Sequence, residues 1–259
     1  MTFSPSEIEE LRVARKLLEN PGLAAKISHV FGSPIEKGFA MLPKKWESIV
    51  NDATRKSIEK ALDVALWTMD PGRPQPPSNR LHKLVVGVTG AAGGAFGLPA
   101  LSVELPVSTT IMLRSIADIA RSEGEDLKKA ESRLQCIQVL ALGGRTAGDD
   151  AAETGYFAAR TALARAVSDA AAHLAGKGFT NKGAPAIVRF ISQIASRFSI
   201  VVSEKMAAQT VPVVGALGGA TINTLFMDHF QNMGRGHFII RRLERLHDPT
   251  EVRRTYLTL

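Results

Sequence analysis

Residues 84–103 read LVVGVTGAAGGAFGLPALSV, and residues 206–227 read MAAQTVPVVGALGGATINTLFM. Neither stretch contains a charged residue, and each is long enough to cross a bilayer. Both are rich in Gly and Ala and contain a proline, Pro99 or Pro212, so their transfer into lipid is less favourable than that of a Leu-rich span. This composition favours tightly packed helical hairpins in which glycine lets two backbones approach. Partial insertion into a membrane and true spanning are the alternatives.

The two stretches also resemble each other. Residues 90–95 (GAAGGA) and 215–220 (GALGGA) share the pattern G-A-x-G-G-A. The repeat suggests an internal duplication, in which two helix–Gly-turn–helix halves pack together. Glu104 and the pair Asp228-His229 then take comparable places, about 14 residues after the first glycine of each motif.

The rest of the chain shows helical periodicity, with no run that alternates apolar and polar residues as strands do. Ser4 or Ser6 is suited to begin a first helix, with Pro5 in its first turn. A long amphipathic helix is expected from about Pro43 to Met69. Gly- or Pro-rich breaks are expected at residues 73–78, 143–148 and 176–183. We therefore predict an all-α multi-helix bundle of about eight or nine helices with two Gly-rich helical hairpins.

The predicted organisation has three parts. Residues 1–42 form an N-terminal helical extension, residues 43–246 the main helical domain, and residues 247–259 a C-terminal tail. The first ten residues contain Glu7, Glu9 and Glu10, and no apolar core follows them, which predicts no signal peptide and a cytoplasmic protein. A solitary thiol, Cys136, agrees with a reducing compartment.

Composition excludes several classes of protein. Hydrophobic residues make up 45% of the 259 residues, which excludes wholesale disorder. One cysteine excludes a disulfide framework and a Cys-based zinc site. The net charge of +7 suits an anionic surface, but no basic run interleaves with aromatic residues, so nucleic acid is not an expected partner. Phosphate-loop, G-x-S-x-G and H-E-x-x-H motifs do not occur in the sequence.

Charged residues beside the apolar stretches are the first candidates for a site. Glu104 stands alone among apolar residues, and a carboxylate there must be paired or solvated because isolated burial is costly. Arg114 and Asp118 lie four residues apart, so they can pair on one helix face or line a pocket. Glu204, in Ser203-Glu204-Lys205, precedes the second stretch and is expected to cover apolar surface or to pair with a neighbour.

The last predicted helix, residues 221–246, supplies the other candidates. His229 and His237 lie on one broad face of this helix, and Asp228 lies to the side of it. The two histidines are about 12 Å apart along the axis, too far to hold one metal ion together. We therefore assign no metal ligands and no cofactor. The basic residues at the C-terminal end of this helix have two interpretations. They stabilise the negative end of the helix dipole, or they contact anionic headgroups of a membrane.

The sequence from about Trp46 to Leu246 resembles the EcsC family of bacterial proteins. The resemblance rests on the G-A-x-G-G block before Leu-Pro, Glu104 to Pro106, Met112 to Asp118, Ser203 to Lys205, Phe226 to Phe230 and Gly236 to Phe238. The family takes its name from an operon whose other products look like an ABC transporter, and some members carry a peptidase or hydrolase label. The resemblance implies a bacterial cytoplasmic protein with a link to the membrane, and it assigns no reaction.

Three functions follow as hypotheses. The favoured one is an accessory or regulatory protein that rests on the inner membrane face or binds lipid, and acts with a membrane transporter. The alternative is a hydrolase, with or without a metal, in which Glu104, Glu204, Asp228, His229 and His237 converge and Arg114 stabilises charge. The third is a module whose hairpins open and insert into lipid. Exposed apolar hairpins would favour self-association, so a homodimer is a further expectation.

Overall fold

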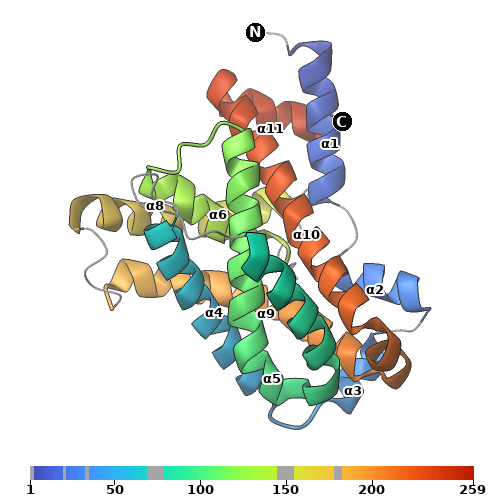
Figure 1. Ribbon diagram of the computed structural model, residues 1–259. Helices are drawn as coiled ribbons and strands as arrows, with labels where there is room; N and C mark the ends of the chain where they lie inside the picture. The colour runs from blue at the N-terminus through green and yellow to red at the C-terminus, as the bar shows by residue number, and fades with distance from the viewer. Residues whose placement is uncertain (1–2, 20–21, 33–34, 69–78, 145–154, 178–182) are drawn as a thin grey trace.

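Ten helices and no strand make up the part of the chain that the structure describes (Figure 1). The computed structural model describes residues 3–19, 22–32, 35–68, 79–144, 155–177 and 183–259, without the side chains of 67–68, 79–100 and 212–218. The prediction of an all-α multi-helix bundle is confirmed. The helices are α1 (Pro5–Leu18), α2 (Leu23–Phe31), α3 (Glu36–Met41), α4 (Trp46–Thr68), α5 (Asn79–Ser122), α6 (Ala130–Leu142), α8 (Gly155–Lys177), α9 (Pro185–Thr210), α10 (Pro212–Leu246) and α11 (Pro249–Thr258).

Local sequence explains where the outer helices begin. Ser4 caps α1, because its hydroxyl accepts the backbone N–H of Glu7 while the Glu7 carboxylate accepts the backbone N–H of Ser4. The predicted helix start at Ser4 is therefore confirmed. Asp248 caps α11 in the same way, through the N–H groups of Thr250 and Glu251.

Helix α9 lies at the centre of the bundle and contacts α2, α3, α4, α5, α6, α8 and α10. Its buried Phe198 packs edge-on against Phe230 and is tilted against Phe226, both from α10. Among the described residues, α9 is also the one helix long and apolar enough to cross a membrane. Because the core helix of a bundle meets the same test, this property by itself does not indicate a membrane span.

The two charge-free stretches lie inside long helices. Residues 79–122 are helical throughout, and a straight helix of 44 residues would extend about 66 Å. Figure 1 instead shows α5 as two arms joined by a turn at the lower end of the molecule. In the second stretch the chain leaves α9 at Thr210 and enters α10 at Pro212. The expected Gly-turn at residues 215–220 is therefore wrong: this motif is helical, and the break in the helix lies at Val211.

The predicted three-part division stays a prediction, but all three parts share one hydrophobic cluster. Leu11 and Leu23 from the first part and Tyr256 from the last are fully buried in the cluster that contains the bundle helices. The predicted linker at residues 73–78 lies outside the described residues, as do large parts of the breaks expected at 143–148 and 176–183. The long helix expected from Pro43 to Met69 is confirmed as α4.

Candidate functional site

Glu104 belongs to a buried ion pair. Its Oε1 lies 2.6 Å from Nζ of Lys205, and the two side chains are 8% and 1% exposed. The ring of Phe226 lies 4.9 Å from the same ammonium group. Burial lowers the pKa of Lys205, and the carboxylate of Glu104 opposes that change. The expectation that a carboxylate at position 104 must be paired is therefore met, and the pair joins α5 to α9 beneath α10.

His237 lies in a buried hydrogen-bond network between α6, α8 and α10. Its Nε2 is 3.1 Å from Oε1 of Gln135, and its Nδ1 is 3.0 Å from the hydroxyl of Tyr156. Since Oε1 of Gln135 is an acceptor, the proton lies on Nε2, and Nδ1 accepts the Tyr156 hydroxyl. Burial, reinforced by the charges of Arg160 and Arg241, holds the pKa of His237 well below its ordinary value. The imidazole of His237 is therefore neutral, and both of its ring nitrogens are used in hydrogen bonds within the bundle.

His229 secures the end of α6. It is 2% exposed, and its Nε2 lies 3.3 Å from the carbonyl oxygen of Gly143. A Cβ on Gly143 would lie 2.5 Å from this nitrogen, so only glycine permits the approach. His229 therefore closes the C-terminal end of α6 against α10.

Glu204 and Asp228 both act on α2. The carboxylate of Glu204 accepts the backbone N–H of Ala24 at 3.2 Å, in the first turn of a helix whose N-cap, Gly22, has no side chain to do so. Burial raises the pKa of Glu204, and this hydrogen bond opposes the rise. Asp228 is exposed, and its negative charge opposes the lowering of the pKa of Lys26 that burial causes.

Asp118 lies on the surface of α5. Its Oδ1 is 2.5 Å from Nη1 of Arg121, three residues further along the helix. The spacing predicted Arg114 as a partner of Asp118, and the structure gives Asp118 an ion pair with Arg121. Arg114 is half-buried on the same helix.

The basic end of α10 is neutralised by acidic residues of other segments. Arg242 contacts Glu10 at 2.9 Å and Glu123 at 2.7 Å, and Arg245 contacts Glu125 at 2.5 Å. We call the following set the arginine network: Arg160 with Glu244, Arg241 and Arg245 with Glu125, and Arg242 with Glu10 and Glu123. These contacts do not support the expectation that the end of α10 serves anionic headgroups.

Six of the seven predicted site residues thus have partners outside the predicted set. Their partners lie on α2, α5, α6, α8 and α9, so the contacts are spread over several parts of the bundle. In the part of the chain that is described, no group of three or more His, Cys, Asp and Glu side chains is arranged to hold a metal ion. This geometry gives the hydrolase hypothesis no support.

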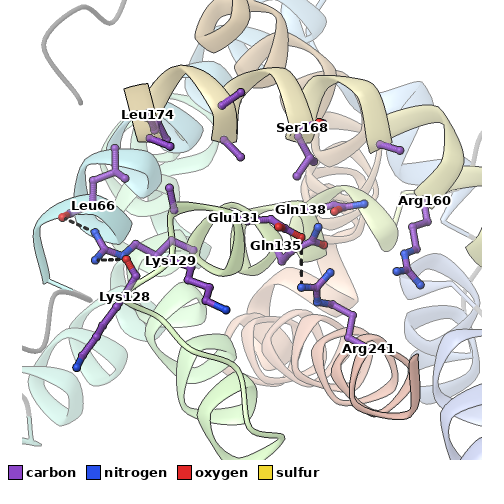
Figure 2. Close-up of a pocket in the computed structure, with 17 residues that line it drawn as sticks. Leu66, Lys128, Lys129, Glu131, Gln135, Gln138, Arg160, Ser168, Leu174 and Arg241 are labelled. Atoms are coloured by element: carbon purple, nitrogen blue, oxygen red, sulfur yellow. Dashed lines mark hydrogen bonds and ion pairs between the residues drawn. The ribbon is translucent and has the colours of Figure 1, made fainter. Parts of the chain in front are cut away.

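A cavity of about 1020 Å³ lies between α6 and α8 (Figure 2). In Figure 2, Leu174 and Ser168 extend from α8 toward α6, and Arg241 approaches from α10. Five lining residues are cationic and one, Glu131, is acidic. The lining from α8 is mostly Ala, Val and Leu. The cavity therefore has one basic side and one apolar side.

A second distinctive region is the α3 end, which we define as α3, the turn in α5 and the α9–α10 junction at Val211. Figure 1 shows these elements together at the lower end of the molecule. The hydroxyl of Thr210, at the end of α9, donates to the carbonyl oxygen of Gly38 at 3.1 Å. A Cβ on Gly38 would lie only 1.9 Å from the carbonyl oxygen of Ala207, so the backbone of α3 rests directly on α9.

The surface of the α3 end is both apolar and basic. Met41 is 54% exposed and Val103 is 72% exposed. Val103 is adjacent to Glu104, whose partner Lys205 lies in the last turns of α9, near Thr210. Lys37 of α3 is exposed, as are Lys44 and Lys45 in the segment that follows α3. The exposed acids beside them are Glu36 and Glu47, so lysines outnumber acids in this segment. Both charge-free stretches reach the same place, since one contains the junction at Val211 and the other is the arm of α5 that leads to Val103.

The sequence interpretation missed Lys205, the partner of Glu104. Its spacing from Phe198, Val201 and Val202 places it on the buried face of α9, and this signal was present in the sequence. It also missed Tyr156 and Gln135, which flank His237, because their positions depend on how α6 and α8 pack.

The fold and these contacts define an all-α bundle protein with a cavity between α6 and α8. The chain belongs to the EcsC protein family, whose model matches residues 6–243. The match includes α1 to α3, so it begins further toward the N-terminus than the resemblance over residues 46–246 predicted. Neither a curated protein nor a solved structure matches the chain.

Proposed function

We propose that this EcsC family protein is a membrane-associated accessory protein that rests on an anionic membrane face through its α3 end. The main support is that both charge-free stretches reach the same end of the bundle. This end exposes the apolar residues Met41 and Val103, and the exposed lysines there are Lys37, Lys44 and Lys45. Apolar side chains that enter the headgroup region, together with lysines beside anionic lipid, are the two contributions that hold peripheral proteins on membranes.

The expected partner is the inner, cytoplasmic face of a bacterial membrane, where the protein acts with a transport system. This part of the proposal rests on the resemblance to the EcsC family, which implies a link to membrane transport, and on the net charge of +7. The protein then has a regulatory role and no reaction of its own.

Vesicle co-sedimentation tests the membrane contact. We expect the full chain to sediment with vesicles of phosphatidylglycerol and phosphatidylcholine at low salt, less at high salt, and little with phosphatidylcholine alone. Each lysine near an anionic surface contributes about 1 kcal/mol, so the variant Lys37→Gln/Lys44→Gln/Lys45→Gln should bind on the order of 100-fold more weakly.

The matched control changes three exposed lysines elsewhere, Lys16→Gln/Lys56→Gln/Lys60→Gln, with the same loss of charge. It should retain most of the binding. A protein that stays in the supernatant with anionic vesicles at low salt contradicts the proposal. Equal losses in the two triple variants would show that net charge, and not the α3 end, drives the association.

A further inference from the structure

We propose that the cavity between α6 and α8 is a binding site for a single-chain anionic amphiphile whose chain carries a hydrogen-bond donor. This site is separate from the α3 end, and the inference does not depend on the membrane contact. The acidic group lies at the N-terminal end of α6, beside Lys128 and Lys129. The chain lies along the apolar face of α8, and its donor reaches Gln138.

The position of the acidic group follows from which cations lack a carboxylate partner. Arg160 is bonded to Glu244 at 2.6 and 2.7 Å, and Arg241 is bonded to Glu125 at 2.7 Å. In the described part of the chain, neither Lys128 nor Lys129 forms an ion pair. The excess positive charge of the cavity is therefore concentrated at one end.

Two further features make the same end suitable for an anion. Arg133 donates to the carbonyl oxygens of Leu66 and Lys128, at 3.2 and 3.3 Å, and to that of Leu127, so its charge is fixed there without a carboxylate. Helix α6 has 13 residues and begins after Lys129, where no side chain caps it; the acid of its first turn, Glu131, is paired with Arg241 at 3.5 Å. The first N–H groups and the positive dipole end of such a helix favour a bound anion.

The opposite wall indicates an aliphatic chain. Ala164, Val167, Ala171 and Leu174 recur at the spacing of one helix face on α8, and Ala175 continues it. None of the described residues that line the cavity is aromatic. A nucleotide base would therefore find no ring to stack on, whereas an alkyl chain can cover this small-residue surface.

Gln138 supplies an independent indication of a ligand. It is 1% exposed and lines the cavity, and its side-chain Oε1 has no hydrogen-bond partner among the described residues. Buried acceptors are normally satisfied, and a hydrogen-bond donor on a cavity occupant would satisfy this oxygen. Gln138 lies nine positions after Lys129, which corresponds to about 13 Å along α6. The donor therefore lies well along the chain from the acidic group.

Calorimetric titration of the full chain, below the micelle concentration of each probe, tests the site. We expect 12-hydroxystearate to bind more tightly than stearate, and its uncharged methyl ester to bind roughly tenfold or more weakly than the acid. Lysophosphatidylglycerol distinguishes the source of the anion: tighter binding than the carboxylate assigns a phosphate headgroup, and weaker binding assigns a free fatty acid.

Two variants with matched controls locate the site. Lys128→Ser/Lys129→Ser should weaken binding of 12-hydroxystearate about tenfold or more, whereas Lys56→Ser/Lys60→Ser, an exposed pair outside both the cavity and the α3 end, should not. Ala171→Trp, which fills the cavity, should abolish binding, whereas Ala162→Trp on the exposed surface of α8 should not. Gln138→Leu should remove the advantage of the hydroxylated chain.

The proposal is overturned if the acid and its methyl ester bind equally, if neither Lys128→Ser/Lys129→Ser nor Ala171→Trp weakens binding, or if stearate binds as tightly as 12-hydroxystearate. Circular dichroism and thermal unfolding of each variant show whether it is folded. Because the cavity is separate from the α3 end, the cavity variants should also still sediment with anionic vesicles. That readout separates failure of the cavity proposal from failure of the membrane proposal.

Discussion

The α3 end and the arginine network handle charge in opposite ways. Near the α3 end, Glu104 and Lys205 form an ion pair that is sealed between helices, while the lysines of α3 and the segment after it remain exposed. In the arginine network the acidic partners come from α1, α10 and the segment after α5, and several of the pairs are partly exposed. A basic helix end in the sequence therefore does not identify an anion-binding surface, because the fold can bring acidic residues to it.

The largest expected effect concerns the sealed pair. Lys205→Met leaves the carboxylate of Glu104 buried without its partner, which should lower the free energy of unfolding by about 3–5 kcal/mol. Replacing both residues, as Glu104→Leu/Lys205→Met, should recover most of the loss. Arg242→Met, in the arginine network and 30% exposed, should cost at most about 1 kcal/mol.

Urea denaturation at pH 7 measures all three variants. If Lys205→Met and Arg242→Met destabilised the protein equally, the contrast between a sealed and a solvated pair would not hold.

The next effect concerns the close approach of α3 to α9. Gly38→Ala places a methyl group against the backbone of Ala207, and overpacking of this kind costs about 1–3 kcal/mol. Gly176→Ala is the control, since no atom lies within 4 Å of its added Cβ. That change lies inside α8 and should stabilise the protein by up to about 1 kcal/mol. Thermal unfolding compares the two, and an unaffected Gly38→Ala variant would show that α3 is not held tightly.

A smaller, pH-dependent effect is expected at the edge of the arginine network. The pKa of His237 is held well below 6.5 in the folded protein, so the unfolded chain takes up a proton first as the pH falls. The stability contributed by neutral His237 is therefore present above pH 6.5. It is lost below that pH, by at most about 1.4 kcal/mol per pH unit.

Unfolding measured between pH 7.5 and 5 tests this. His237→Gln should flatten the dependence, whereas His29→Gln, an exposed histidine, should leave it unchanged. A pH dependence that is identical in wild type and His237→Gln would contradict a buried, neutral imidazole.

The sequence predicted the helices of this fold better than the contacts between them. Helical periodicity identified α4 almost to its ends, and the cap at Ser4 followed from a local pattern. The Gly-turn at residues 215–220 was wrong because Gly is compatible with a helix when tertiary packing supports it, and Pro212 at the first helical position marks the actual start of α10.

The candidate site was predicted less well for a physical reason. Glu104 stood out because a lone acid among apolar residues must find a partner, but the identity of Lys205 depends on how α5 and α9 pack. The cavity between α6 and α8 has no sequence motif at all. Lys128 is notable because it lies at the start of α6, and Gln138 because it lines a cavity that α8 closes. Neither arrangement can be predicted from the residues themselves, because both depend on how the helices pack.

The most direct test of the central claim compares two exposed apolar residues at different regions of the molecule. Met41 is 54% exposed at the α3 end, and Leu246 is 59% exposed at the end of α10, beside the arginine network. The native Cys136 is fully buried, and burial raises the pKa of its thiol, so Met41→Cys and Leu246→Cys can each be labelled selectively with an environment-sensitive fluorophore. On anionic vesicles, the label at position 41 should shift to the blue and become shielded from an aqueous quencher, while the label at position 246 should not. A shift at position 246 with none at position 41, or no shift at either, would contradict a membrane contact through the α3 end.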